Sequence, residues 1–188
     1  NAYINMGTQN TSETSKTSAQ DFNQGLSVNG TINNVSYMTT LNSTETKGMS
    51  EAAGEDFEED TFSRVNVLQK IGFKANDKLS FEFFGNYDRI KNTFDNSFDG
   101  IIANADDLNN NSFSEQFRIG FLPKYKYNNG EFAINAGAST IDRVLNISNS
   151  WSGTIDNYNY SGRSASIDAF NKYNFSKQVY LVLGAQYQ

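Results

Sequence analysis

The feature that most constrains this chain is a two-residue alternation of apolar and polar side chains, which recurs along nearly its whole length. It is clearest between residues 113 and 127. One set of alternate positions there is apolar, namely Phe117, Ile119, Phe121, Pro123, Tyr125 and Tyr127. Successive side chains of a β-strand point to opposite faces of a sheet, so this repeat predicts strands with one apolar and one polar face.

About nine segments carry the alternation and are therefore predicted strands. They lie around residues 2–6, 26–28, 35–41, 62–74, 79–88, 113–127, 131–139, 165–170 and 179–187. Two residues of the fourth segment break the pattern, because Leu68 falls on the polar side and Gln69 on the apolar side. Most of the segments are about as long as a tilted strand that crosses a bilayer.

The connections between these segments are predicted to alternate in length. Short turns are predicted at 32–34, 76–77, 128–130 and 175–177, and long polar loops at 10–19, 48–60, 95–111 and 148–157. Barrels of the bacterial outer membrane have short periplasmic turns and long extracellular loops. The sequence therefore predicts an all-β fold, an antiparallel transmembrane β-barrel arc of about nine strands, with the long loops at the cell surface.

The composition excludes several kinds of functional site. The chain has no Cys and no His, which rules out Ser-His-Asp and Cys-His catalytic sites and removes the commonest zinc ligands. Its formal net charge of −6 argues against nucleic acid as a partner. No apolar run reaches the ~20 residues of a transmembrane helix, and no signal peptide follows Asn1. We expect no enzymatic activity.

The odd number of predicted strands bears on the domain organisation. It would leave the two chain ends on opposite sides of the membrane, whereas single-chain bacterial barrels have even strand numbers. The first and last strands would also be unpaired edges in lipid, which is costly. We therefore expect residues 1–188 to be a partial transmembrane β-barrel domain within a longer protein. A complete barrel of eight or ten strands is the alternative.

Several segments resemble TonB-dependent receptors of the outer membrane, in particular those of Bacteroidetes that are identified as cobalamin receptors. They are DTFSRVN at 60–66, IGF at 71–73, NDKLSF at 76–81, NYD at 86–88, FDNSFD at 94–99, EQFRIG at 115–120 and DAFNKY at 168–173. The resemblance implies the N-terminal part of a ~22-stranded barrel with a plugged lumen. The plug domain, the TonB box and the remaining strands would lie outside this sequence.

The resemblance also implies a function and a location. The expected location is the outer membrane of a Gram-negative, Bacteroidetes-like bacterium, in contact with its lipid. The expected function is active uptake of a scarce nutrient, cobalamin or another large chelate, which the extracellular loops and plug would bind. TonB would act through the absent plug, and a surface lipoprotein is a further candidate partner.

Other functions remain open as alternatives. A siderophore or glycan importer would belong to the same class of receptor. A passive porin or structural outer-membrane barrel would lack the plug. An outer-membrane lipase or protease would need catalytic residues from outside this sequence, and a soluble β-rich binding module would need no membrane.

Two of the predicted long loops are acidic and form a candidate calcium site. The candidate ligands are Glu55, Asp56, Glu58, Asp60, Asp95, Asp99, Asp106 and Asp107. Clustered carboxylates are the oxygen ligands that calcium prefers, and the resemblance implies calcium-ordered loops at equivalent places. A solvated acidic surface is the alternative explanation. No other cofactor is expected.

Aromatic and charged residues supply the remaining candidates. Trp151 in the fourth predicted loop, with Tyr158 and Tyr160 nearby, could stack on a corrin, siderophore or sugar, although an outer aromatic girdle or packing within the loop explains them equally well. A second aromatic group, beside the short turns, is Tyr125, Tyr127, Phe132, Tyr173 and Phe175.

The charged residues expected on the lumen-facing side are Arg64, Lys70, Glu82, Asp88, Arg118, Lys124, Lys126, Arg143 and Asp168. Their spacing shows no catalytic constellation.

Overall fold

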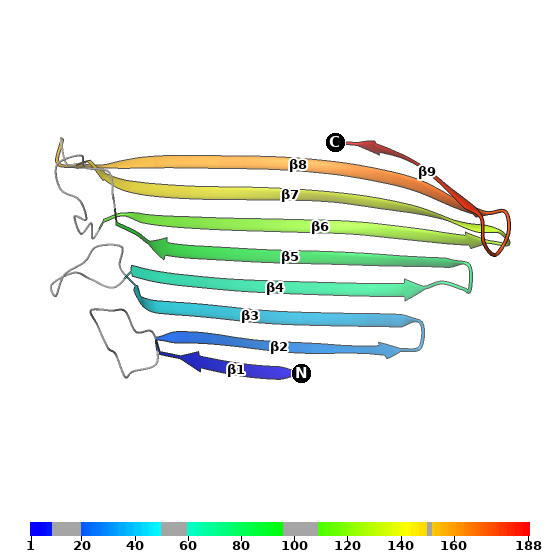
Figure 1. Ribbon diagram of the computed structural model, residues 1–188, viewed down its shortest axis with the longest axis horizontal. Helices are drawn as coiled ribbons and strands as arrows, with labels where there is room; N and C mark the ends of the chain where they lie inside the picture. Colours follow the sequence, from blue (N-terminus) through cyan, green and yellow to red (C-terminus); the bar gives the residue numbers. More distant parts are fainter. Residues whose placement is uncertain (9–19, 50–59, 96–108, 150–151) are drawn as a thin grey trace.

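The chain folds into a single antiparallel sheet in the computed structural model, which describes residues 1–8, 20–49, 60–95, 109–149 and 152–188. Its strands are β1 (Ala2–Gly7), β2 (Asp21–Ile32), β3 (Val35–Met49), β4 (Asp60–Lys74), β5 (Leu79–Thr93), β6 (Asn111–Tyr127), β7 (Gly130–Asn149), β8 (Thr154–Asn174) and β9 (Tyr180–Tyr187). Each strand pairs with its neighbours in sequence, from β1 at one edge to β9 at the other (Figure 1). The predicted nine antiparallel strands are confirmed. The sheet is open, because its described edge strands do not pair with each other.

The register of the strands sorts their side chains onto two faces. The apolar face carries the even-numbered residues of β1, β2 and β7 and the odd-numbered residues of the other strands; the polar face carries the rest. One irregularity is present, between Lys47 and Met49 where β3 pairs with the start of β4. The two faces therefore continue across all nine strands without a change of side.

The apolar face is not covered by any other part of the described chain. Phe83 and Ile119, near its middle, are 52% and 48% exposed. Among the described residues, Ala133 is the only buried hydrophobic side chain, with 3% exposed. A soluble domain places such side chains inside a core, whereas this sheet presents them outward. The described part of the chain contains no helix with the length and hydropathy of a membrane span.

Neighbouring rings cover part of the apolar face. Phe81 stacks between Phe73 and Phe121, with centroid distances of 6.4 and 6.0 Å, and Phe83 lies 4.5 Å from Phe121. Gln69, the polar exception predicted on this face, shares a hydrogen bond at 2.6 Å with the hydroxyl of Thr39 on the adjacent strand. This cross-strand hydrogen bond lowers the free-energy cost of placing the polar Gln69 side chain on the apolar face.

The short turns move stepwise across the sheet. One row of cross-strand partners runs from β2 to β8 through Leu26, Leu41, Val67, Tyr87, Phe117, Thr140 and Arg163. From this row to the short turn, β3 extends six residues to Val35, whereas β8 extends eleven to Asn174. The short-turn ends of the strands are thus displaced by five residues over the five steps from β3 to β8. Figure 1 shows the same stepwise shift of the turns. With ~3.3 Å per residue and ~4.8 Å between strands, this offset corresponds to a strand tilt of about 35° in a closed barrel.

The four predicted short turns are confirmed, and side chains stabilise several of them. Asn33 takes up a φ of 53° between β2 and β3, a conformation that Asn tolerates better than most residues. The Asn76 side-chain oxygen accepts hydrogen bonds from the backbone N–H groups of Lys78 and Leu79 at 2.8 and 2.9 Å. Ser176 does the same for the turn before β9. Asn and Ser oxygens in such positions favour tight turns.

The fourth predicted long loop, 148–157, is wrong. β7 continues to Asn149 and β8 begins at Thr154, so the connection is only residues 150–153. Gly153 closes it with a φ of 66°. Amide side chains hold the ends of the two strands together, with Asn157 donating to Asn146 at 2.6 Å and Asn149 to Asp156 at 3.0 Å. Polar side chains alone do not distinguish a loop from a hairpin whose strand ends are joined by amide contacts.

Candidate functional site

The charged residues singled out from the sequence lie together on the polar face. All nine share the side given by the register, from Arg64 on β4 to Asp168 on β8. The prediction that they form one stripe is confirmed. Whether that side faces a lumen is not decided by the register.

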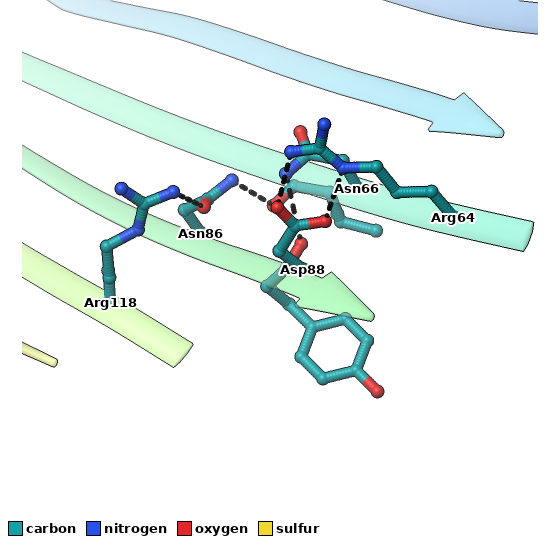
Figure 2. Close-up of polar contacts among 7 residues, drawn as sticks. Arg64, Asn66, Asn86, Asp88 and Arg118 are labelled. Carbon is teal, nitrogen blue, oxygen red and sulfur yellow. Dashed lines mark hydrogen bonds and ion pairs between the residues drawn. The ribbon is translucent and has the colours of Figure 1, made fainter. Parts of the chain in front are cut away.

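The centre of the stripe is a hydrogen-bonded cluster on β4, β5 and β6 (Figure 2). Arg64 donates to both carboxylate oxygens of Asp88, from Nε at 2.8 Å and from Nη2 at 2.5 Å. Arg118 donates to the side-chain oxygen of Asn86 at 2.9 Å, and Asn86 donates to the backbone oxygen of Val67 at 3.1 Å. Asp88 and Asn86 are only 7% and 8% exposed. We call Arg64, Asn66, Asn86, Asp88 and Arg118 the central polar cluster.

The residues of this cluster suit a structural role in the sheet. A two-point arginine–carboxylate pair is a strong, directional contact that fixes both side chains. None of its five members is a hydroxyl or thiol nucleophile. The cluster therefore orders the polar face and presents guanidinium and amide N–H groups to whatever lies against it.

Sequence reasoning missed the two asparagines of the cluster. Asn66 donates to the backbone oxygen of Tyr87 at 3.4 Å, and Asn86 joins Arg118 to β4 as described above. Only charged residues were considered when the stripe was drawn. The parity of Asn66 and Asn86, which is that of Arg64 and Asp88, would have placed them on the same face.

A basic groove crosses the polar face near the short turns. It has a volume of about 550 Å³, and its lining includes Ser36, Lys74, Ser80, Glu82, Lys124 and Lys126. Lys74 contacts Asp77 at 2.8 Å, and this hydrogen bond holds the pKa of the Asp77 carboxyl below its ordinary value. Lys124 pairs with Glu131 at 3.3 Å. Asp77 and Glu131 thus balance two of the three lysines, so the groove offers ammonium groups with little excess positive charge.

The candidate ligand-binding aromatics are only partly placed. Tyr158 and Tyr160 lie within strand β8, on its polar face, and are 44% and 56% exposed. Trp151 lies outside the described residues. The proposed stacking on a ligand stays a prediction.

Most candidate calcium ligands fall outside the described residues, namely Glu55, Asp56, Glu58, Asp99, Asp106 and Asp107. Asp60 begins β4, and Asp95, which follows β5, is 5% exposed. Within the described residues, no group of three or more acidic side chains could hold a metal ion. The calcium site therefore stays a prediction for the two loops.

Comparison with known proteins adds no further information: no protein-family model, curated protein or solved structure matches this chain.

Proposed function

We propose that residues 1–188 form part of the wall of an outer-membrane β-barrel transporter, with the apolar face against lipid and the polar face toward the lumen. The observation that carries this proposal is a charge-free band on the apolar face. The charged strand residues of that face are Glu45, Lys47, Arg89, Lys91, Glu115, Asp142 and Arg163. All of them lie at or beyond the row through Tyr87 and Phe117, on the side of the long connections.

The height of this band suits the hydrocarbon core of a membrane. On β6 it extends over nine residues, from Phe117 to Tyr125, which are eight residue-to-residue steps. That corresponds to about 27 Å along the strand and ~22 Å of depth at a tilt of about 35°, close to the ~25 Å apolar band of outer-membrane barrels. The tilt comes from the register and the strand ends, so it supports the proposal independently of residue composition.

Aromatic residues at the short-turn border give further support. Tyr125 and Phe132 form a cross-strand pair on the apolar face, and the ring of Tyr173 meets that of Phe175 edge-on at 4.9 Å. These rings lie where a barrel has its periplasmic aromatic girdle. The predicted grouping of aromatics beside the short turns is confirmed, and its role as a girdle is part of the proposal.

The class of transporter rests on the resemblance to TonB-dependent receptors. In that class the polar face would contact a plug domain supplied by the rest of the protein. The central polar cluster and the basic groove offer hydrogen-bond donors and lysine ammonium groups for such contacts. Cobalamin or another large chelate remains the proposed cargo, and a passive porin is the competing function.

Uptake by cells distinguishes the two functions. The test compares accumulation of labelled cobalamin in cells that carry the intact protein and in cells that lack it, with and without a protonophore. An energy-coupled receptor predicts uptake that requires the protein and stops when the proton gradient collapses. Uptake of small solutes that continues after collapse would favour the porin, and no dependence of cobalamin uptake on the protein would remove cobalamin as the cargo.

A further inference from the structure

Two cations meet an aromatic ring on the apolar face, just beyond the charge-free band. Arg89 and Lys91, both on β5, lie over the ring of Phe113 on β6. The guanidinium carbon of Arg89 is 5.6 Å from the ring centroid, and the Lys91 ammonium is 5.5 Å from it. Both distances are within the range of cation–π contacts, which hold cations beside the ring.

These residues line a groove with excess positive charge. The groove measures about 660 Å³, and its lining includes Thr61, Arg89, Lys91, Asn111, Phe113 and Glu115. The carboxylate of Glu115 accepts a hydrogen bond at 2.6 Å from Tyr87, which borders the band. Two cations against one carboxylate leave the groove with a net charge of +1. Hydroxyl and amide groups from Thr61 and Asn111 add further hydrogen-bond donors.

In the orientation of the proposed function, on which this step rests, the groove lies near the height of the lipid headgroups. Arg89 and Lys91 follow Tyr87 by two and four residues on the same face. At ~3.3 Å per residue and a tilt of about 35°, they would lie roughly 5–11 Å beyond the hydrocarbon core. The polar headgroup layer occupies about 5–8 Å on each side of that core, so the backbone of Arg89 would lie within it and that of Lys91 just beyond its outer edge.

We infer that Arg89 and Lys91 bind the phosphate of a membrane lipid in the leaflet on the side of the long connections. The guanidinium and ammonium groups would contact the phosphate oxygens, while the acyl chains would lie along the apolar face beside Phe117 and Ile119. Basic residues at a membrane surface attract anionic lipid, and arginine suits phosphate oxygens geometrically. Phe113 keeps both cations at the border of the band.

Lipid binding to the intact, detergent-solubilised protein tests this inference by native mass spectrometry. The probes are phosphatidylglycerol and, for comparison, zwitterionic phosphatidylcholine. The double variant R89Q/K91Q should bind phosphatidylglycerol on the order of tenfold more weakly. Phosphatidylcholine binding should change little. R89K/K91R keeps both charges and should keep most of the binding.

A matched control removes the same number of positive charges from the polar face. K70Q/R143Q removes one lysine and one arginine from the polar face and should leave phosphatidylglycerol binding unchanged. Equal loss in both double variants, or no loss in R89Q/K91Q, would overturn the inference while leaving the membrane wall intact. Displacement of phosphatidylglycerol by equimolar inorganic phosphate would point to a simple anion site and also count against it. Failure of the wild-type protein to insert into bilayers would instead remove the proposed function.

Discussion

The two faces of the sheet differ in how many of their side chains find partners within the chain. On the polar face, Asp88 is buried against Arg64, and other charges find partners across strands, as Lys70 does with Glu82 at 3.4 Å. On the apolar face, large side chains such as Phe83 and Ile119 remain about half exposed. Several charges of the polar face are thus paired within this chain, although Oδ1 of Asp168 is buried without a hydrogen-bond partner among the described residues, whereas the large side chains of the apolar face are left uncovered. Lipid covers them in the proposed function.

Arginine substitutions on the two faces of β6 should separate them most strongly. Ile119→Arg places a charge in the middle of the apolar face and should destabilise the membrane-inserted protein by about 2–4 kcal/mol. Phe121→Arg should act similarly. Urea unfolding of the intact protein in phospholipid vesicles measures the effect. Gln116→Arg, on the polar face opposite Asp88, is the control and should be tolerated; similar losses on both faces would show that the orientation is wrong.

Two glycines on adjacent strands give a smaller contrast. Phe84 lies across Gly120 on the polar face, where an added Cβ would be 2.1 Å from the ring. Gly120→Val should therefore cost about 1–3 kcal/mol through overpacking. A Cβ added to Gly85, on the apolar face, would meet nothing within 4 Å, so Gly85→Ala should be neutral or slightly stabilising. The same unfolding assay compares them, and equal destabilisation would contradict the packing seen around Phe84.

Ion pairs within the polar face should differ according to burial. Arg64→Met leaves the nearly buried Asp88 carboxylate without its two-point donor and should cost about 1–3 kcal/mol. Lys70→Met removes a partner from Glu82, whose side chain is 43% exposed, and should cost less than about 1 kcal/mol. Denaturation midpoints of the two variants check the order. A larger loss for Lys70→Met would mean that the cluster does not order the face.

The smallest expected effect is a pH dependence at the turn between β4 and β5. The hydrogen bond from Lys74 lowers the pKa of Asp77, so this contact stabilises the fold above the unfolded-state pKa, about 3.9. The contribution is lost as the pH falls through the lower folded-state pKa. Unfolding of Asp77→Asn and wild type should therefore differ slightly at pH 7 and converge in acid. A difference that grows in acid would contradict this assignment.

Most of the fold could be predicted from the sequence because side-chain parity is a local property. Phe117, Ile119 and Phe121 mark the apolar side of β6 without reference to any other strand. Closure into a barrel does not follow from parity, which assigns side chains to faces but says nothing about how edge strands such as β1 and β9 would pair. The hairpin at Asn146–Asn157 was missed because its stabilising amide contacts join residues on two strands.

The candidate sites were less predictable for a related reason. Charges such as Arg64 and Asp88 could be assigned to one face by counting, but their pairing is diagonal, since the register places Asn66 opposite Asp88. The cation pair over Phe113 depends on the β5–β6 register, which the sequence alone does not fix. Partners across strands become visible only when the alignment of the strands is known.

The orientation of β6 in a membrane tests the central claim most directly. The chain has no Cys, so single cysteines at positions 116 to 121 of an otherwise cysteine-free intact protein can carry a spin label in lipid vesicles. The proposed wall predicts that labels at Phe117, Ile119 and Phe121 are accessible to oxygen dissolved in lipid, and that labels at Gln116, Arg118 and Gly120 are accessible to a water-soluble nickel complex. Accessibility that does not alternate, or that alternates with the opposite phase, would contradict the account.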